Sequence, residues 1–456
     1  MRTFPLLAAA AALAFAVPAL AQTTPADLRD AALKDDIAWD ITEGLTTEIG
    51  PRLAGTPDEA RARAWAVEKL KALGFHNVRI ETYRMPVWVR GEEKAEILGP
   101  FPQRLVLAAL GNSGSTGTRP LEAEIVYFPT LADLQAAPDG SLKGKIAFVS
   151  HAMHRTQDGS SYGPYGQVRR AGPAVAARKG AAAILIRSIG TDYHRNPHAG
   201  GTSWPEGVKP IPAAALSLPD SEQLERVIKR GKPVKVRLTL TPQFVGERES
   251  GNVIAEVPGS DPGAGIVLVG GHLDSWDLGT GAIDDASGVA ITAAAAKRIM
   301  ESGQPRRTIR VVWFGAEEVG VFGGRAYAEA HKGERHAAAA ESDFGADRIW
   351  KFDVNLPASA AAVGDRLATA LSPLGITRGR DIAGDGADVG PMMQRGVAAI
   401  DLAQDGSRYF DLHHTPDDTL DKIDPEQLRQ NVAAWTAMLA IVANAPEEIG
   451  PVTPRP

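Results

Sequence analysis

Residues 266–274 read Ile-Val-Leu-Val-Gly-Gly-His-Leu-Asp, an apolar run that leads directly into a histidine and an aspartate. Four consecutive apolar residues ahead of two glycines predict a short strand that is buried on both faces. Such strands are typical of parallel α/β sheets, in which functional sites form at the carboxyl ends of the strands. We therefore expect His272 and Asp274 to stand at the functional edge of a sheet of this kind.

Further apolar runs and helical stripes follow this strand along the chain. We predict strands at 309–314, 337–340 and 397–402, and helices at 286–300 and 425–443. Asp424 is the expected N-cap of the last helix, and Trp435 belongs to its buried stripe. Apolar strands that alternate with helices predict an α/β fold, with a mostly parallel sheet that helices cover on both faces.

The segment from about Leu98 to Thr241 has a different texture. Short β-type runs there are separated by loops rich in glycine and proline, and one helix-like stretch covers Gln167–Lys179. This change is typical of a compact module inserted into a larger domain. We predict a discontinuous domain of residues 22–97 and 242–449, an inserted β-rich domain of residues 98–241, and a disordered tail at 450–456.

The first 21 residues have the pattern of a secretory signal peptide. Arg2 is followed by an apolar run from Leu6 to Val17, and Ala19-Leu20-Ala21 is a small-x-small cleavage pattern. No later stretch has the roughly 18 consecutive apolar residues of a membrane-spanning helix. We predict cleavage after Ala21 and a periplasmic or secreted mature protein with no membrane partner.

The composition excludes several classes of function. The chain has 456 residues, of which 44% are hydrophobic and 23% are charged, as in ordinary globular proteins. A formal net charge of −6 gives no general electrostatic reason to bind nucleic acid. The absence of cysteine excludes disulfides, thiol catalysis and cysteine-based zinc sites. Any metal must therefore be held by His, Asp and Glu.

Acidic residues and histidines follow several of the predicted strands or open the helix after one. They are His272, Asp274, Asp284, Asp285, Glu317, Glu318, Asp343, His413, His414 and Asp418. Each has an ordinary structural explanation on its own, since an Asp can cap a helix and a pair of Glu can be a solvated corner. Together at one sheet edge, imidazole and carboxylate groups suit zinc, and they are numerous enough for two ions that share a carboxylate. Of two adjacent glutamates, one can ligate a metal while the other takes the proton of a bound water.

These residues resemble the motifs of metallopeptidase family 28, the co-catalytic zinc exopeptidases. The matching elements are Gly-Gly-His-x-Asp-Ser at Gly270–Ser275, Asp-Asp-Ala-Ser-Gly at Asp284–Gly288, Phe-x-x-Glu-Glu at Phe314–Glu318, Glu-Ser-Asp at Glu341–Asp343 and His-x-x-x-Asp-Thr at His414–Thr419. The inserted segment resembles a protease-associated domain. The order of modules is most similar to the carboxypeptidase Q group of the family. The resemblance implies an exopeptidase with two zinc ions per chain, dipeptides or short peptides as substrates, and assembly as a homodimer.

The resemblance also implies which residues hold the metal. His272 and Asp343 would ligate one zinc ion, and Glu318 and His414 would ligate the other. Asp284 would bridge the two ions.

The remaining site residues would support this metal pair. Glu317 would be the general base, and Asp274 would hold the ring of His272 in place. Asp418 would do the same for His414. His413 stands where several family members have a tyrosine that stabilises the oxyanion, and it would take that role. Asp353 competes with Asp343 for the ligand position on its strand.

The residues leave the recognised end of the peptide open. An aminopeptidase needs carboxylates near the free amine of its substrate, and a carboxypeptidase needs a cation near the free carboxylate. Arg325, Arg395 and Arg408 are candidates for that cation. A non-catalytic, receptor-like protein on the same scaffold would be expected to lack ligands, and here every expected ligand is present.

Two other patterns are interpreted as structural. The Gly-x-Ser-x-Gly match at Gly159–Gly163 lacks the directly preceding strand of a serine-hydrolase nucleophile. His194 and His198 are interpreted as loop residues, because Pro197 opposes the helix that would align them.

Overall fold

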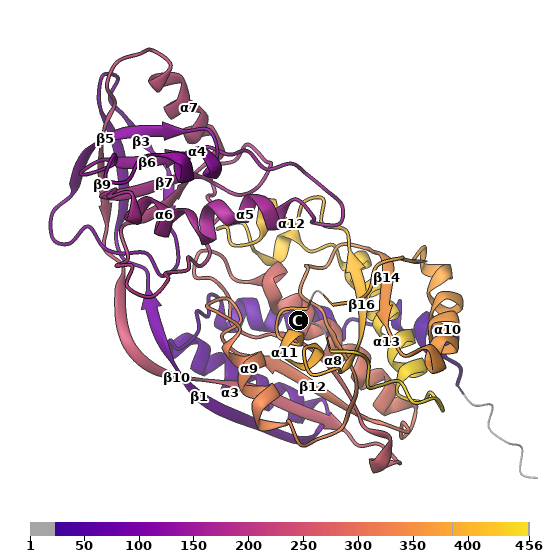
Figure 1. Cartoon of the computed structure of the whole chain (residues 1–456). Helices are drawn as coiled ribbons and strands as arrows, with labels where there is room; N and C mark the ends of the chain where they lie inside the picture. Colours follow the sequence, from indigo (N-terminus) through magenta and orange to yellow (C-terminus); the bar gives the residue numbers. More distant parts are fainter. Residues whose placement is uncertain (1–22, 385, 455–456) are drawn as a thin grey trace, which may run out of the picture.

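The computed structural model describes residues 23–384 and 386–454, so the predicted signal peptide lies outside the described residues. The chain forms two lobes, which we call the main lobe (residues 23–92 and 241–454) and the inserted lobe (residues 93–240). Two long strands, β1 (His76–Val89) and β10 (Gln243–Val257), run along the main lobe toward the inserted lobe (Figure 1).

The main lobe is built on an eight-stranded sheet. Its strand order is β1, β10, β12 (Thr308–Phe314), β11 (Ile266–His272), β13 (His336–Glu341), β16 (Ala398–Gln404), β14 (Ile349–Asn355) and β15 (Thr377–Arg378). β11 pairs in parallel with β12 and β13, and β13 pairs in parallel with β16. The predicted α/β class is confirmed, and the strand that begins at Ile266 lies in the parallel centre of the sheet.

The expectation of a mostly parallel sheet is only partly right. β1 pairs with β10, β10 with β12, and β14 with β16, all antiparallel. The pairing of β1 with β10 has a topological reason, since the chain leaves the main lobe after β1 and returns along β10. If β1 and β10 were parallel, the chain would have to cross back over the main sheet before it entered β10.

Helices cover both faces of the main sheet. One face packs against α1 (Pro25–Ala32), α2 (Ile37–Gly44), α3 (Pro57–Ala72), α8 (Ser287–Ser302), α10 (Ala361–Leu371) and α13 (Pro425–Val442), and the other against α9 (Phe322–Ala330) and α11 (Gly390–Met393). Residues of the central strand alternate between these two cores, with Val267 and Val269 in one and Leu268 in the other.

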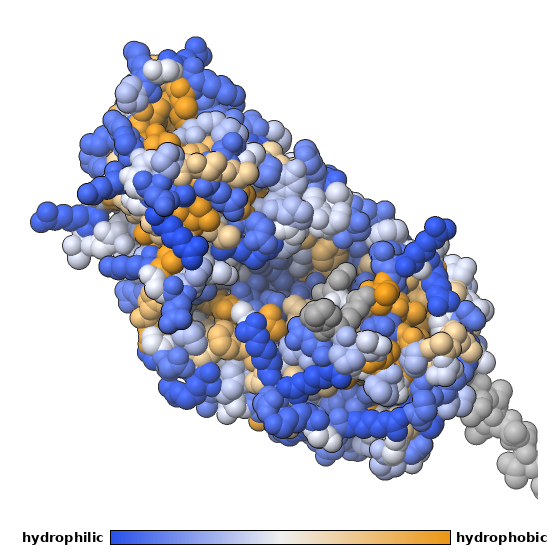
Figure 2. Space-filling view, viewed as in Figure 1, coloured by the Kyte–Doolittle hydropathy of each residue, from blue (hydrophilic) through white to orange (hydrophobic). Residues whose placement is uncertain are grey.

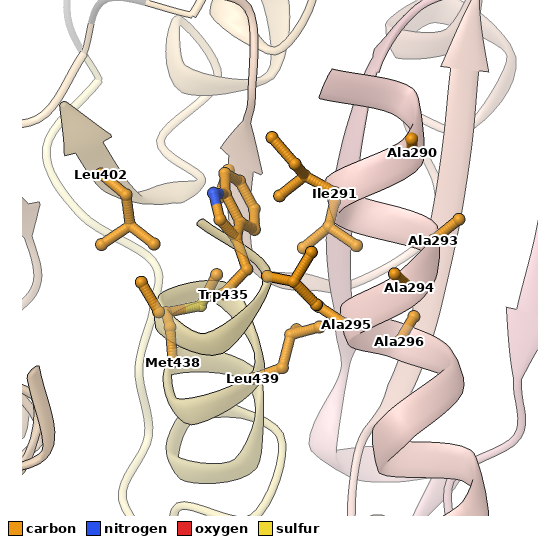
Figure 3. Close-up of a cluster of buried hydrophobic side chains, with 14 of the residues drawn as sticks. Ala290, Ile291, Ala293, Ala294, Ala295, Ala296, Leu402, Trp435, Met438 and Leu439 are labelled. Carbon is orange, nitrogen blue, oxygen red and sulfur yellow. The ribbon is translucent and has the colours of Figure 1, made fainter. Parts of the chain in front are cut away.

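The packing of α13 against α8 fixes the helix that follows the predicted ligand Asp284. Asp424 caps α13 as expected, because its carboxylate accepts hydrogen bonds from the backbone N–H groups of Glu426 and Gln427. Trp435 is fully buried, with Ile291 of α8 on one side and Leu402 of β16 on the other (Figure 3). The many alanines of α8 let the bulky indole fit against that helix.

The inserted lobe contains a second eight-stranded sheet. Its order is β3 (Gln103–Leu105), β2 (Glu93–Gly99), β9 (Lys235–Leu240), β5 (Leu121–Phe128), β6 (Ile146–Val149), β7 (Ala183–Arg187), β8 (Ala213–Leu216) and β4 (Leu107–Ala109). Strands β5 to β8 are parallel neighbours, and a hydrophobic cluster lies on each face of the sheet. The lobe also contains α4 (Leu131–Ala136), α5 (Tyr162–Arg170), α6 (Gly172–Arg178) and α7 (Leu218–Ile228). It is a mixed α/β unit, and the boundaries at 98 and 241 stay a prediction.

The helix-like stretch at 167–179 forms two helices, α5 and α6, which are separated at Ala171. α5 begins already at Tyr162 and lies beside α12 (Tyr409–Leu412) of the main lobe (Figure 1). The ring of Tyr162 stacks on Phe410 of α12, with 4.2 Å between the ring centroids. This contact joins α12 of the main lobe to α5 of the inserted lobe.

The chain end is attached to the main lobe beyond the point where disorder is predicted. The backbone N–H of Val452 donates a hydrogen bond to the carbonyl of Gly396 at 2.9 Å, and residues 455–456 lie outside the described part. Among the described helices, none is both long and apolar enough to span a membrane.

Candidate metal centre

The predicted ligands come together at the carboxyl-end edge of the parallel strands. His272 is the last residue of β11, Glu318 follows β12, and Asp343 follows β13. Asp284 lies in the turn Ala282–Ala286 that opens α8. His414 follows α12 and has a φ of 60°, a conformation in which few non-glycine residues are found and which is typical of functional sites.

Asp284 lies between the two histidines and presents one oxygen to each. His272 Nε2 lies 3.0 Å from Asp284 Oδ1, and His414 Nε2 lies 3.1 Å from Asp284 Oδ2. His272 Nε2 is also 3.4 Å from Asp343 Oδ1, and His414 Nε2 is 2.8 Å from Glu318 Oε2. The five side chains thus form two groups of nitrogen and oxygen donors with one shared carboxylate.

The donor set has the properties of a metal site. Asp284 Oδ2 is buried and accepts no hydrogen bond from any residue that the structure describes, although the ring nitrogen of His414 lies 3.1 Å away. Two atoms that ligate the same ion lie close together without a hydrogen bond between them. A hydrogen-bond donor and its acceptor at this distance would instead be aligned. Burial lowers the pKa of His414 to about 4, so the ring is neutral and its nitrogen can ligate. Burial raises the pKa of Glu318 and of Asp343, and the negative charge of the neighbouring Asp284 raises both further. Bound divalent ions would supply the missing positive charge, and zinc suits these ligands.

Glu317 lies beside the donor groups. Its backbone N–H donates a hydrogen bond to Asp274 Oδ1 at 3.1 Å, which ties the residue to the loop after β11. Burial raises the pKa of the Glu317 carboxyl well above its usual range. A carboxylate with a raised pKa is suited to accept and return a proton near neutral pH.

Asp274 and Asp418 hold the site differently from the expectation. His272 Nδ1 lies 2.9 Å from the backbone carbonyl of Asp274, while the Asp274 carboxylate is 3.7 Å away. Asp418 Oδ1 accepts a hydrogen bond from the backbone N–H of Ile283 at 2.6 Å. Asp418 therefore positions the turn that carries Asp284, and the Nδ1 of His414 faces the carbonyl of Ala199 at 3.1 Å.

His413 and His414 are stacked, with 3.5 Å between their ring centroids. His413 Nε2 lies 3.5 Å from Asp284 Oδ2, and His413 Nδ1 is buried without a hydrogen-bond partner among the described residues. His198, from the inserted lobe, bonds the carbonyl of His413 through Nδ1 at 3.0 Å. Its ring nitrogens approach those of both histidines closely enough to form a further group of three. His198 lies in a loop, as expected, but no local sequence pattern predicts this contact.

Two more residues organise the loops that carry the donors. Arg52 is fully buried and donates hydrogen bonds to the carbonyls of Leu273 (2.5 Å) and Gly281 (2.9 Å), on the loops after His272 and before Asp284. Asp285 accepts a hydrogen bond from the backbone N–H of His272 at 3.0 Å. Arg52 belongs to a Gly-Pro-Arg-Leu sequence whose role no local pattern reveals.

Other sequence candidates lie away from the donors. Asp353, the competitor of Asp343, pairs with Lys351 at 3.1 Å. The hydroxyl of Ser161 donates a hydrogen bond to the carbonyl of His154 at 2.5 Å and is not at the end of a strand.

A cavity of about 390 Å³ opens onto the donor groups, between the lobes. Figure 2 shows the surface hollowed where the two lobes meet. The main lobe contributes Asp284, Glu317, Glu318, Val319, Gly320, Val321, Asp343, Phe344, Tyr409, Phe410, His413 and His414 to its lining, and the inserted lobe contributes Asn112, Tyr162, Arg169, Arg170, Gly201, Thr202 and Ser203. The volume is near the lower end of the roughly 300–1,000 Å³ of small-molecule sites.

The three arginines suggested by sequence do not line this cavity. Arg408 forms an ion pair with Asp347 at 2.6 Å, and Arg325 and Arg395 line a different pocket. The cations that do line it, Arg169 and Arg170, belong to α5 of the inserted lobe.

Comparisons with known proteins agree with this geometry. Residues 252–439 match the sequence model of Peptidase family M28. The chain is 34% identical to carboxypeptidase Q of Bos taurus over 407 residues, which cover 88% of this chain and 84% of the relative.

Solved structures match the whole fold. The Peptidase M28 precursor from Shewanella amazonensis SB2B has a TM-score of 0.92 and 48% sequence identity, and the match covers 94% of this chain and 98% of that chain. A zinc aminopeptidase from Bacillus subtilis has a TM-score of 0.64 and 22% identity, over 91% of this chain and 97% of that one. The second likeness shows a common fold.

Proposed function

The chain belongs to peptidase family M28 and is a metallo-exopeptidase, and from that premise we propose that it hydrolyses dipeptides or short peptides with two zinc ions. The observation that carries the proposal is the position of Asp284, with one oxygen 3.0 Å from His272 Nε2 and the other 3.1 Å from His414 Nε2. A carboxylate placed in this way can bridge two ions.

The distances support a division of the ligands between the ions. His272 and Asp343 would hold one zinc ion, Glu318 and His414 would hold the other, and Asp284 would contribute to both. Bound zinc lowers the pKa of water to about 7 and polarises a peptide carbonyl.

The side chains of the protein have the remaining tasks. Glu317 takes the proton of the attacking water and passes it to the leaving amine, for which its raised pKa is suited. His413, which lines the cavity beside Asp284, donates a hydrogen bond to the developing oxyanion. Phe344, Tyr409 and Phe410 form an apolar part of the cavity lining and limit the access of bulk water.

Carboxypeptidase activity on dipeptides is supported by the similarity to carboxypeptidase Q over most of both chains. Aminopeptidase activity is the second candidate, because a zinc aminopeptidase shares the fold. A non-catalytic role on the same scaffold is disfavoured by the presence of all five ligands and Glu317.

The test is hydrolysis of an unblocked dipeptide by the pure protein, before and after chelation and after zinc is added back. We expect cleavage that chelation abolishes and zinc restores. A panel of N-blocked and C-blocked dipeptides, read by mass spectrometry, then separates the two activities. Absence of cleavage of every peptide by the zinc-loaded protein would contradict the proposal.

We also propose a periplasmic or secreted location, on the basis of the N-terminal sequence pattern. Mass spectrometry of the protein from a bacterial host should find a mature chain that begins at Gln22. A mature chain that retains Arg2 would contradict this location.

A further inference from the structure

The two walls of the cavity carry opposite kinds of charge. The charged residues that the main lobe contributes to the lining are carboxylates, and each of them already has a task as a metal ligand or as the base. The charged residues that the inserted lobe contributes are Arg169 and Arg170. Within the described lining, no carboxylate is left to bind a free amine, and two cations face the cavity.

Arg169 is a buried cation without a counterion. Its exposed fraction is 6%, and it forms no ion pair with any carboxylate in residues 23–384 and 386–454. One terminal nitrogen donates to the hydroxyl of Tyr162 at 2.7 Å. The other lies 3.1 Å from His414 Nδ1 and donates a long hydrogen bond to the carbonyl of Ala199 at 3.4 Å, and Nε has no partner among the described residues. Buried charges are normally paired, because an unpaired charge loses its hydration without compensation. An anion that enters the cavity would supply the missing partner.

Arg170 adds a second positive charge to the same side of the cavity. It forms no ion pair among the described residues, and only one of its terminal nitrogens donates to a backbone carbonyl, that of Gly163 at 2.7 Å. Its guanidinium lies over the ring of Tyr162, 5.5 Å from the centroid, while that of Arg169 lies 5.7 Å from it. Both guanidinium groups thus lie close to the ring of Tyr162, which also lines the cavity.

We propose that Arg169 and Arg170 bind the free C-terminal carboxylate of the peptide substrate, which makes the protein a carboxypeptidase or dipeptidase and not an aminopeptidase. The inference rests on the proposed function and specifies which end of the peptide is recognised. Guanidinium groups match a carboxylate in geometry and form strong charge-assisted hydrogen bonds with it.

Distance supports the same assignment. Arg169 lies against the ring of His414 on the side opposite to Nε2, the nitrogen that faces Asp284 and Glu318. One residue of extended peptide spans at most roughly 3.3–3.6 Å. A carboxylate on the arginines would therefore place the last peptide bond of the substrate, and not a more distant one, at the donor groups.

The test compares peptides that differ only at the C-terminus. The kcat/KM of the zinc-loaded protein is measured on an unblocked dipeptide and on its C-terminal amide, for the natural protein, Arg169→Gln, Arg170→Gln and Arg178→Gln. Arg178 is an exposed residue on the neighbouring helix α6 and does not line the cavity, so its variant is a matched control for the loss of charge.

We expect the natural protein and the control to prefer the free acid to the amide by roughly 10–100-fold, the range of a charge-assisted hydrogen bond. Arg169→Gln and Arg170→Gln should lose most of that preference, chiefly through KM. Because Arg169 contacts His414, zinc content is measured for each variant. If Arg169→Gln loses zinc, its kinetics are set aside and the Arg170→Gln variant is the decisive one.

Preference of the natural protein for the amide, or an equal loss on both peptides in Arg170→Gln, would overturn the inference. Both results would leave the peptidase function standing. If no peptide of any kind is cleaved, the proposed function itself fails, and this outcome is distinct from the other two.

Discussion

Two glutamates that are adjacent in sequence meet different partners in the metal centre. Glu318 lies 2.8 Å from His414 Nε2, whereas Glu317 has its backbone bonded to Asp274 and lies outside the donor groups. Glu317→Gln should keep zinc and lose most turnover, since removal of a general base costs roughly 10²–10⁴-fold. Glu318→Gln should lose zinc affinity as well. The measurements are zinc content and kcat for both variants, and activity of Glu317→Gln within a few-fold of the natural protein would show that the roles are wrongly assigned.

The adjacent histidines give a second contrast between neighbouring residues. His414 Nε2 approaches both Asp284 and Glu318, while His413 Nε2 approaches only Asp284, at 3.5 Å. His414→Ala should lower zinc content and activity together. His413→Ala should keep zinc and reduce kcat by roughly 10²–10³-fold, as removal of an oxyanion donor does. If His413→Ala is the variant that loses zinc, the two residues have exchanged roles.

At the residue scale, the sequence predicts those site residues that follow strands or open helices. The structure brings His272, Asp284, Glu318, Asp343 and His414 together because the parallel strands end at one edge of the sheet. Residues on other segments give no such signal. Arg52, His198 and Arg169 reach the centre only through tertiary packing of the N-terminal region and the inserted lobe.

Among the helices and strands, α13 illustrates what an N-cap residue and a periodic stripe of apolar residues can predict. Its N-cap Asp424 and its buried Trp435 are confirmed. The edges of the main sheet were less predictable, because the antiparallel pairing of β1 with β10 depends on where the chain returns from the inserted lobe. The break between α5 and α6 follows from Gly172-Pro173, because a proline ends the helix that precedes it and can open the next one.

Replacement of Trp435 tests the packing between α13 and α8. Trp435→Ala should lower the free energy of unfolding by roughly 3–5 kcal/mol, the range for removal of a buried aromatic side chain. Trp435→Phe should cost less, because the indole N–H has no hydrogen-bond partner among the described residues. Denaturant titration of both variants checks this, with zinc content as the control for the intact site. A loss below about 1 kcal/mol for the alanine variant would contradict the packing described.

His336 at the start of β13 should make stability depend on pH. Burial lowers its pKa to about 4 from an ordinary 6.5, and its Nε2 accepts a hydrogen bond from Tyr327 at 2.8 Å in the neutral form. The unfolded chain therefore takes up a proton at higher pH than the folded chain. The contribution of His336 is fully present above pH 6.5 and is lost as the pH falls through 4, by up to roughly 3 kcal/mol.

To test the role of His336, the free energy of unfolding is measured at pH 7 and at pH 4.5 for the natural protein and for His336→Gln. Glutamine cannot be protonated, so the variant should lose less stability over this interval. An equal loss in both proteins would show that other groups cause the acid sensitivity.

At the scale of the whole molecule, the cavity belongs to both lobes. The main lobe supplies the metal ligands and the base, and the inserted lobe supplies Arg169 and Arg170 through α5. The stacking of Tyr162 on Phe410 and the ion pair between Arg155 and Asp411, at 2.7 Å, hold the two lobes against each other there. The sequence indicates an inserted segment from its texture, but its closure of the cavity depends on long-range contacts that no local pattern encodes.

Anomalous diffraction at the zinc edge from zinc-loaded crystals shows whether Asp284 bridges two zinc ions. We expect two anomalous peaks per chain, both beside Asp284. One peak should lie against His272 and Asp343, and the other against Glu318 and His414. A single peak per chain, or zinc bound away from Asp284, would show that Asp284 does not bridge two zinc ions.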